Sequence, residues 1–283
     1  RRIINHYILC KRSSEMDELK FAVIGNPVSH SLSPDIHIFF ASQFQLERYT
    51  YKKIQSNEND FEKDINDFFK KGGAGLNVTV PFKGLAYNLC DRLDQSAAQC
   101  KSVNTIMVDS GNLIGYSTDG QGLIDDFLDK KISLEESRIL IIGAGGSAAS
   151  IISSLLLHGK IKEISIHNRT KSNALKLLDL FETNRLLVHE EGDEYDIVLN
   201  TTPISMNVDD IILPPELIIN KPICYDLFYD KEKTLFQKWA EKNESRGNYD
   251  GLGMLIHQAK HSFKIWNNLS PDIDGLEELL RRN

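Results

Sequence analysis

Short apolar runs alternate with longer amphipathic segments along most of the chain. Runs that are apolar or alternate with period two predict β-strands at 20–24, 47–54, 75–80, 103–108, 112–116, 138–142, 163–167, 196–200 and 222–228. Apolar positions spaced three or four apart, or capping residues, predict helices over about 34–44, 60–71, 84–93, 120–131, 233–243 and 250–283, and from the glycine-rich turn at 143–148 to 158. Alternating strands and helices predict an α/β protein.

The predicted elements fall into two units that meet near residue 120. In the first unit, the strands at 103–108 and 112–116 flank Asp109-Ser110-Gly111, a hairpin signal, so its open sheet is expected to be mixed. The second unit opens with an uninterrupted apolar strand at 138–142, which is typical of parallel sheets covered on both faces. A chain of 283 residues is long enough for two such domains.

The stretch at 75–83 carries two polar side chains on one side of an apolar strand. Strand residues alternate between faces, so Asn77 and Thr79 point away from the apolar positions between them. Pro81 has no N–H for a ladder, so we expect the strand to end there. Lys83 would then stand beside the two polar residues, where the next helix begins. This pattern fits a cleft wall with an ammonium group, or a core strand followed by a surface lysine.

A loop dense in turn-forming residues follows the first strand and ends in Ser31-Leu32-Ser33-Pro34. Ser33 before Pro34 predicts a helix start with the serine hydroxyl as N-cap and proline in the first turn. Ser31 has no such local role, although a loop serine is often merely solvated. The two serines are therefore candidates for a binding loop.

The second unit begins with strand, glycine turn, helix and strand in the order that a dinucleotide-binding unit requires. The turn, Gly143 to Ala148, allows close approach of a pyrophosphate to a helix N-terminus. After the second strand, where an acid would hold the ribose of NAD, stands Arg169. A guanidinium in that place favours the 2′-phosphate of NADP, and a surface ion pair is the alternative.

Composition and charge narrow the function further. The formal net charge is -7 and no basic patch stands out, so nucleic acids and anionic membranes are not expected as partners. No apolar run approaches the roughly 18 residues of a membrane-spanning helix. Four scattered cysteines fit reduced thiols in the cytoplasm, and the eight histidines show no metal-binding spacing, so we expect no metal. The basic, aperiodic segment 1–15 is expected to be a non-native or disordered leader rather than a signal peptide, with Met16 as a possible start.

Taken together, these motifs closely resemble those of the shikimate dehydrogenase family, from about residue 19 onward. The resemblance rests on the serine pair before Pro34, on Asn77 to Lys83, on Val103-Asn104-Thr105, on Thr118-Asp119-Gly120 and on the glycine turn with Asn168-Arg169-Thr170. It implies a two-domain α/β fold in which the C-terminal helices return to the first domain. The substrate domain would then comprise 16–119 and 251–283, and a Rossmann-type NADP domain would comprise 120–250.

The resemblance also implies roles for individual residues. Lys83 and Asp119 would form the catalytic pair. Substrate contacts would come from Ser31, Ser33, Thr79, Asn104, Asp119, Tyr229 and Gln258. NADP would be held by Gly143, Ala144, Gly145, Gly146, Ser147, Asn168, Arg169, Thr170, Thr202, Leu227 and Gly251. The implied reaction is the reversible, NADP-dependent reduction of 3-dehydroshikimate to shikimate in chorismate and aromatic amino-acid biosynthesis, by a monomer or homodimer.

Four positions depart from the family pattern. Ser117 stands where asparagine usually precedes Thr-Asp, Ser205 replaces a glycine, and Asp230 replaces a proline after the tyrosine. Asn173 stands where many members carry a second basic residue for the 2′-phosphate, although Lys171 could compensate. None of these changes touches the lysine–aspartate pair.

The chemistry of a ketone reduction agrees with that pair. A lysine is protonated at neutral pH, and a nearby carboxylate keeps it so, which lets Lys83 donate a proton while Asp119 orients it. The alternatives are a quinate or quinate/shikimate dehydrogenase, a non-catalytic regulator that senses metabolites with the same fold, and an unrelated Rossmann binding protein. The Ser-x-Ser pair and Arg169 speak against the first, the intact lysine and aspartate against the second, and the first unit's motifs against the third.

Overall fold

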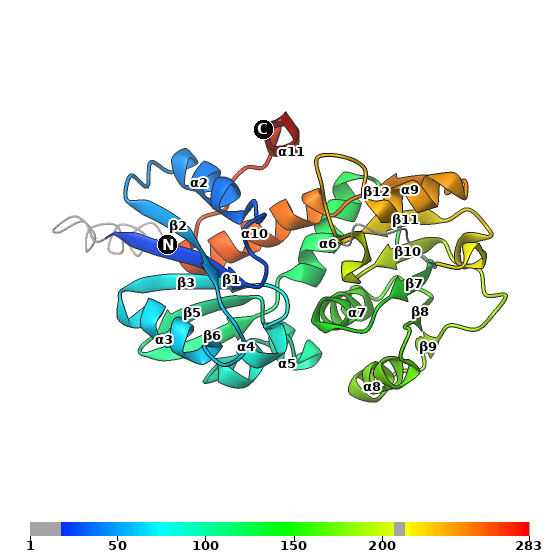
Figure 1. Ribbon diagram of the computed structural model, residues 1–283, viewed down its shortest axis with the longest axis horizontal. Helices are drawn as coiled ribbons and strands as arrows, with labels where there is room; N and C mark the ends of the chain where they lie inside the picture. Colours follow the sequence, from blue (N-terminus) through cyan, green and yellow to red (C-terminus); the bar gives the residue numbers. More distant parts are fainter. Residues whose placement is uncertain (1–17, 207–212, 283) are drawn as a thin grey trace.

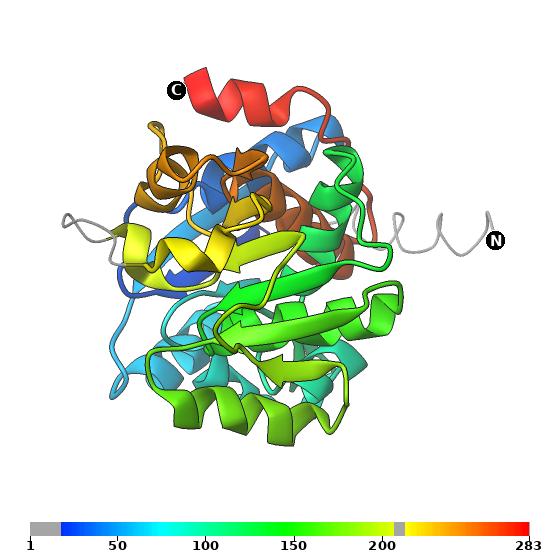
Figure 2. The same ribbon diagram turned by 90° about the vertical axis from the view of Figure 1, so that its right-hand side faces the viewer.

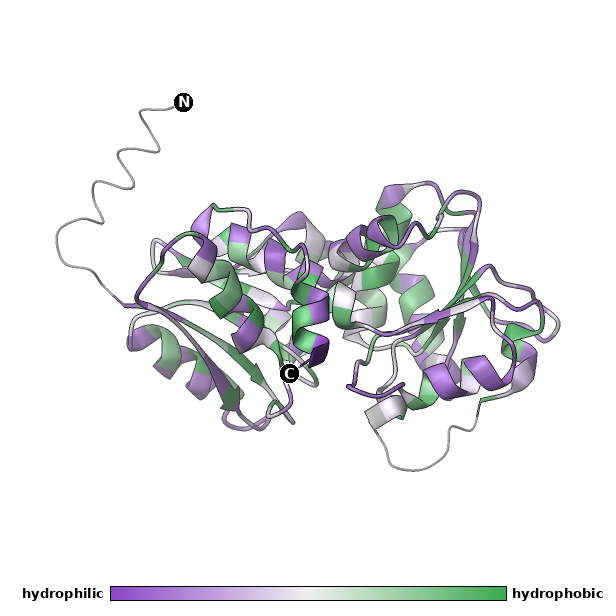
Figure 3. Ribbon diagram, turned by 90° about the horizontal axis from the view of Figure 1, so that it is seen from above, coloured by the Kyte–Doolittle hydropathy of each residue, from purple (hydrophilic) through white to green (hydrophobic). Residues whose placement is uncertain are grey.

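The structure is a computed structural model that describes residues 18–206 and 213–282. The segment 1–15, expected to be a leader, lies outside these residues. Two six-stranded sheets lie side by side, with helices α6 (Asp119–Asp129) and α10 (Leu252–Asn267) between them (Figure 1). Apolar and polar residues alternate along most helices, as expected of helices with one buried face (Figure 3).

The first sheet is mixed, as the hairpin signal predicts. Its strand order is β2-β1-β3-β5-β6-β4, and β3 pairs antiparallel with β5. The elements of this part are β1 (Leu19–Gly25), α2 (Ser33–Gln43), β2 (Tyr49–Gln55), α3 (Phe61–Lys70), β3 (Gly73–Val78), α4 (Lys83–Leu89), β4 (Arg92–Leu93), α5 (Gln95–Cys100), β5 (Thr105–Asp109) and β6 (Asn112–Tyr116). Its apolar side chains pack in two clusters, one on each face.

The second sheet is parallel throughout, in the order β12-β11-β10-β7-β8-β9. Its elements are β7 (Arg138–Ile142), α7 (Gly146–His158), β8 (Glu163–His167), α8 (Lys171–Phe181), β9 (Leu186–Val188), β10 (Ile197–Asn200), β11 (Ile223–Asp226), α9 (Leu235–Lys242) and β12 (Gly247–Tyr249). Figure 2 views this sheet with its strands side by side. Read from β9, the order is that of a doubly wound dinucleotide-binding sheet, in which ligands bind where the order reverses, between β7 and β10.

Helix α10 joins the two cores. Met254 belongs to the cluster on the second sheet, whereas Leu252, Ile256 and Phe263 belong to the cluster on the first. Helix α10 also packs along α6, and a Cβ on Gly122 of α6 would come within 2.7 Å of the backbone of α10. The final helix, α11 (Leu276–Arg282), packs Leu276 and Leu280 into the same first-sheet cluster as Phe263.

Three predicted boundaries were wrong. The strand predicted at 75–80 ends at Val78. The backbone N–H of Thr79 still donates to the carbonyl of Ile24, but the chain then turns away from the sheet. The helix predicted at 84–93 ends at Leu89, and β4 and α5 follow, with Asp94 as N-cap of α5. The helix predicted at 250–283 is two helices, because Asn268 ends α10 in the left-handed conformation.

The N-cap predicted for Ser33 was also wrong. Ser33 is the first residue of α2, and the N-cap position is occupied by Leu32. The side chain of Leu32 makes no capping hydrogen bond. Instead the backbone N–H of Ser33 donates to Oγ of Ser31 at 3.2 Å. The structure therefore gives Ser31 the local role that the sequence pattern assigns to Ser33.

Candidate active site

Lys83 and Asp119 meet between the two sheets. Lys83 begins α4 and Asp119 begins α6, and Nζ of Lys83 lies 2.6 Å from Oδ2 of Asp119. The two side chains are only 12% and 8% exposed, so the ion pair is largely shielded from water. Nζ also donates to Oγ of Ser147, in the glycine turn, at 2.9 Å. The structure thus joins the predicted acid–base pair directly to the predicted cofactor turn.

Asn104 holds the second oxygen of Asp119. Its amide nitrogen donates to Oδ1 of Asp119 at 2.8 Å and lies 3.3 Å from Oε1 of Gln258. Its amide oxygen accepts from the backbone N–H of Thr118 at 2.9 Å. Asn104 and Gln258 are both buried. The carboxylate is therefore fixed in orientation by a side chain that is itself fixed.

Behind this pair lies a network of buried polar side chains that the sequence patterns did not reveal. Asn77, expected in a cleft wall, is 5% exposed and fully engaged inside the protein. It accepts from the Tyr51 hydroxyl at 2.7 Å and donates towards Thr105 at 3.1 Å and Ser262 at 3.0 Å. One signal could have found Ser262, since it lies four positions after Gln258 on the same face of α10.

The remaining substrate candidates lie in the segments that follow β1 and β3, where Tyr229 from the second unit joins them. Oγ of Ser31 donates to Oγ of Ser33 at 3.1 Å, and the backbone N–H of Leu32 donates to the Tyr229 hydroxyl at 3.4 Å. Burial raises the pKa of Tyr229, so its hydroxyl stays protonated at neutral pH. Thr79 is partly exposed just beyond β3 and packs so closely on Gly25 that a Cβ there would clash with it.

The glycine turn presents an open helix N-terminus. Gly143 has a φ of 113°, which favours glycine, and Gly145 occupies the N-cap of α7 without a side-chain partner. Gly145 and Gly146 are exposed, while Ala144 is half-buried. The first amides of α7 are thus available for an anion such as a pyrophosphate. These residues fit the predicted dinucleotide.

The loop after β8 carries the predicted phosphate contacts. Arg169 is exposed and makes no hydrogen bond or ion pair with any residue in the described ranges. Asn168 donates to the backbone carbonyl of Thr170 at 2.8 Å, which shapes the loop. Burial, followed by the neighbouring His189, lowers the pKa of His167 at the end of β8. Arg169 is therefore an exposed cation without a partner among the described residues, as the predicted phosphate contact requires.

Three further cofactor candidates stand at the ends of neighbouring strands. Thr202 follows β10, and Leu227 follows β11. The backbone N–H of Leu227 donates to the carbonyl of Asn200 at 2.9 Å. Gly251 lies against Leu227, because a Cβ at 251 would come within 2.1 Å of its carbonyl oxygen. All three lie at the carboxyl edge of the second sheet, close to where the strand order reverses.

The departures from the family pattern are accommodated locally. The Ser117 hydroxyl lies 2.7 Å from that of Ser150 on α7. The Ser205 hydroxyl donates to the buried Asp226 at 2.6 Å, a carboxyl whose pKa burial raises although its hydrogen bonds oppose the shift. Asp230 and Asn173 are exposed. None of the four lies among the direct contacts of Lys83 or Asp119.

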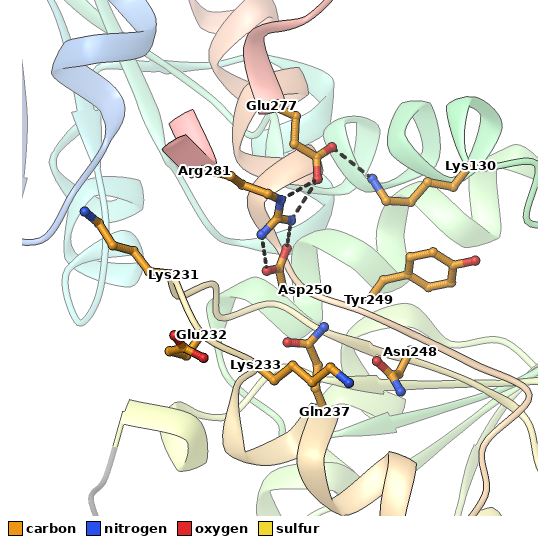
Figure 4. Close-up of a pocket in the computed structure, with 10 residues that line it drawn as sticks. All are labelled: Lys130, Lys231, Glu232, Lys233, Gln237, Asn248, Tyr249, Asp250, Glu277 and Arg281. Atoms are coloured by element: carbon orange, nitrogen blue, oxygen red, sulfur yellow. Dashed lines mark hydrogen bonds and ion pairs between the residues drawn. The ribbon is translucent and has the colours of Figure 1, made fainter. Parts of the chain in front are cut away.

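A charged cavity of about 210 Å³ lies elsewhere, beside α11 (Figure 4). Its lining comprises Lys130, Lys231, Glu232, Lys233, Gln237, Asn248, Tyr249, Asp250, Glu277 and Arg281, none of them a predicted site residue. Arg281 is paired there with Asp250 and Glu277, and Lys130 with Glu277. Both of these cations are thus already paired with carboxylates.

Within 18–206 and 213–282, no group of three histidine, cysteine or acidic side chains could hold a metal ion. Within the same ranges, none of the helices has the length and apolarity needed to span a bilayer.

Known proteins with similar sequences belong to the family that the arrangement of the site residues resembles. A profile for the shikimate dehydrogenase substrate binding domain matches residues 23–106, one for shikimate / quinate 5-dehydrogenase matches 126–208, and one for the shikimate 5′-dehydrogenase C-terminal domain matches 251–281. The chain is 39% identical over 267 residues to a shikimate dehydrogenase (NADP(+)) of Shewanella woodyi, which covers 93% of this chain and 97% of the relative.

Solved structures show the same similarity. A shikimate dehydrogenase from Aquifex aeolicus has a TM-score of 0.83 at 28% identity, covering 95% of this chain and 99% of that one. A shikimate 5-dehydrogenase from Thermus thermophilus, solved with NADP(H) and shikimate, has a TM-score of 0.82 at 30% identity, covering 93% and 99%. The fold and site define a two-domain α/β protein with a Rossmann-type dinucleotide-binding sheet. The chain belongs to the shikimate dehydrogenase family.

Proposed function

We propose that this protein catalyses the reversible, NADP-dependent reduction of 3-dehydroshikimate to shikimate, a step of chorismate and aromatic amino-acid biosynthesis. One observation carries the proposal: Lys83, paired with Asp119, also contacts Ser147 in the glycine turn. The acid–base pair and the dinucleotide turn therefore share one space, as a hydride transfer between ketone and nicotinamide requires. The family relationship supplies the substrate and the cofactor.

The first sheet with α10 and α11 would form the substrate domain, residues 16–119 and 251–283. Residues 120–250 would form the NADP domain. In the substrate domain, the hydroxyls of Ser31 and Ser33 would bind the substrate carboxylate. Further substrate contacts would come from Thr79, Asn104, Asp119, Tyr229 and Gln258. Hydroxyl and amide groups of this kind match the carboxylate and hydroxyls of a polar ring compound.

In the NADP domain, the free amides at the start of α7 would hold the pyrophosphate, and Arg169 the 2′-phosphate. Ala144, Gly145, Gly146 and Ser147 would contribute to the pyrophosphate site with Gly143, and Asn168 and Thr170 would frame Arg169. Thr202, Leu227 and Gly251 would border the nicotinamide at the ends of their strands. The bound cofactor supplies or takes the hydride.

The protein's own part in the reaction is proton transfer and positioning. The Lys83 ammonium would give a proton to the developing alkoxide during reduction, and the neutral amine would take one back during oxidation. Asp119, fixed by Asn104, would hold the lysine in place and stabilise its charge. General acid–base help of this kind is worth roughly 10²–10⁴-fold. We further propose a cytoplasmic protein that acts as a monomer or homodimer.

A spectrophotometric assay tests the function. Purified protein would be given shikimate or quinate, each with NADP⁺ or NAD⁺, and reduced nicotinamide would be followed by absorbance. The proposal expects the highest kcat/KM with shikimate and NADP⁺. Higher kcat/KM with quinate would instead indicate a quinate/shikimate dehydrogenase, and absence of turnover with all four pairs would indicate a metabolite-binding regulator.

A further inference from the structure

We infer that Ser147 is a positioning residue for Lys83, in addition to the cofactor contact that its place in the glycine turn suggests. The inference rests on the proposed function, since it assigns Lys83 the role of proton donor. The observation behind it is the hydrogen bond of 2.9 Å from Nζ of Lys83 to Oγ of Ser147.

The donor count of the lysine supports this role. An ammonium group has three N–H donors. Asp119 takes one at 2.6 Å and Ser147 takes a second, and the two acceptors come from the starts of different helices, α6 and α7. With two donors fixed from two directions, the third N–H has a defined direction, and it is the one left for the substrate oxygen.

The glycine turn approaches the start of α4 closely beside this contact. A Cβ on Gly146 would come within 2.9 Å of Oγ of Ser102 and 3.5 Å of Cβ of Lys83. The backbone carbonyl of Lys83 in turn accepts from the N–H of Val103 at 3.1 Å. Gly146 therefore lies close to both Ser102 and Lys83, and the adjacent residue Ser147 is brought within reach of the lysine.

A hydroxyl suits this position because it can reverse its role. Asp119 as a carboxylate can only accept a hydrogen bond, which favours the charged lysine. The Ser147 hydroxyl accepts from the ammonium and can donate to the lone pair of the neutral amine that remains after proton transfer. Ser147 thus serves Lys83 in both directions of the reaction.

The test is a set of variants assayed with shikimate and NADP⁺. Ser147→Ala should lower kcat about tenfold, the usual effect of one hydrogen bond to a charged group, while KM for shikimate stays within about twofold. Ser147→Thr keeps the hydroxyl and should restore most of kcat. Ser153→Ala is the matched control, because Ser153 lies on the same helix and its hydroxyl donates to Gln99, at 3.4 Å, and not to the site.

A double-mutant cycle separates positioning from cofactor binding. In a Lys83→Ala background, Ser147→Ala should leave kcat unchanged, since there is no ammonium left to position. Losses that multiply in the double mutant, an unchanged kcat in Ser147→Ala alone, or an effect confined to KM for NADP⁺ would each overturn the inference.

A second readout does not depend on turnover. In cofactor-free protein, acylation of Lys83 by acetic anhydride can be compared by mass spectrometry with that of Lys52, an exposed lysine on β2. Releasing the Ser147 contact should raise the relative rate for Lys83 at least about threefold in Ser147→Ala and not in Ser153→Ala. No increase would show that the contact does not hold the lysine, even if the proposed reaction proved wrong.

Discussion

The side-chain amide of Asn104 donates a hydrogen bond of 2.8 Å to Oδ1 of Asp119, and this contact leaves Oδ2 for the ammonium of Lys83. The carboxylate thus accepts from two donors, the neutral amide of Asn104, which fixes its plane, and the charged ammonium of Lys83. Because Asn104 is buried, that plane is set before any substrate arrives.

The first prediction concerns this pair. Lys83→Ala should lower kcat by about 10²–10⁴-fold with little change in KM, because the proton donor of the transition state is lost. Asp119→Asn should also lower kcat, and the double mutant should lose less than the product of the two effects. Steady-state kinetics measures all three. Near-normal kcat in Lys83→Ala would refute the assignment, and a large rise in KM alone would make Lys83 a binding residue.

The second prediction concerns cofactor choice. Arg169 is exposed on the loop after β8, where its guanidinium can reach a 2′-phosphate. Arg169→Ala should raise KM for NADP⁺ at least about tenfold and leave KM for NAD⁺ nearly unchanged. Lys176→Ala, an exposed lysine on α8, is the control and should change neither value. Equal losses with both cofactors would remove the phosphate role from Arg169.

The third prediction concerns the serine pair. Ser31→Ala removes both a proposed ligand of the substrate carboxylate and the acceptor for the backbone N–H of Ser33. It should raise KM for shikimate and cost about 1 kcal/mol of unfolding free energy, as the loss of a helix-end acceptor does. Ser29→Ala, an exposed serine in the same loop, should do neither. An unaltered KM in Ser31→Ala would leave Ser31 a purely local helix-start residue.

The fourth prediction concerns acid stability. Complete burial among aromatic rings lowers the pKa of His37 from 6.5 to about 3, so folding keeps this histidine neutral. Between these two pH values the unfolded chain binds the proton and the folded one does not. The contribution of the neutral His37 to the free energy of unfolding is therefore fully present above about pH 6.5 and is lost as the pH falls towards about 3.

Between pH 7 and pH 5 this loss amounts to about 2 kcal/mol for one histidine. His37→Phe should reduce the difference in unfolding free energy between the two pH values by that amount, whatever its own effect at pH 7. His30→Gln, at an exposed position, is the control. Urea titrations at both pH values provide the measurement, and an identical pH dependence in His37→Phe would contradict the prediction.

The fifth prediction concerns the C-terminal helix. Arg281 on α11 donates to both oxygens of Asp250, at 2.9 and 2.7 Å, and Asp250 is buried. Arg281→Ala leaves that carboxylate without its cation and should cost about 2 kcal/mol of unfolding free energy. Arg282→Ala should cost almost nothing, because its pair with Glu278 is exposed, at 77% and 78%. Equal thermal midpoints for the two variants would contradict this.

The sequence by itself determined most of the local elements and the family, although α8, β9 and β12 were not predicted. The strands at 138–142, 163–167 and 112–116 have the predicted bounds, because apolar runs and turn residues act over a few positions. The glycine turn was also readable, since only glycine serves at Gly143, with its φ of 113°. Where the predicted bounds failed, at Leu89 and Asn268, a new helix capped by Asp94 follows or the backbone turns left-handed, and hydrophobic periodicity reports neither.

The tertiary structure alone decided how distant residues share the site. No spacing in the sequence shows that Asn77 turns inward to Tyr51 and Ser262, because these contacts join strands and a helix up to 185 positions apart. The same holds for Lys83 and Ser147, which meet only because the two sheets pack at the starts of α4 and α7. Periodicity reports which face of an element is buried, whereas the partner on that face depends on how the elements pack together.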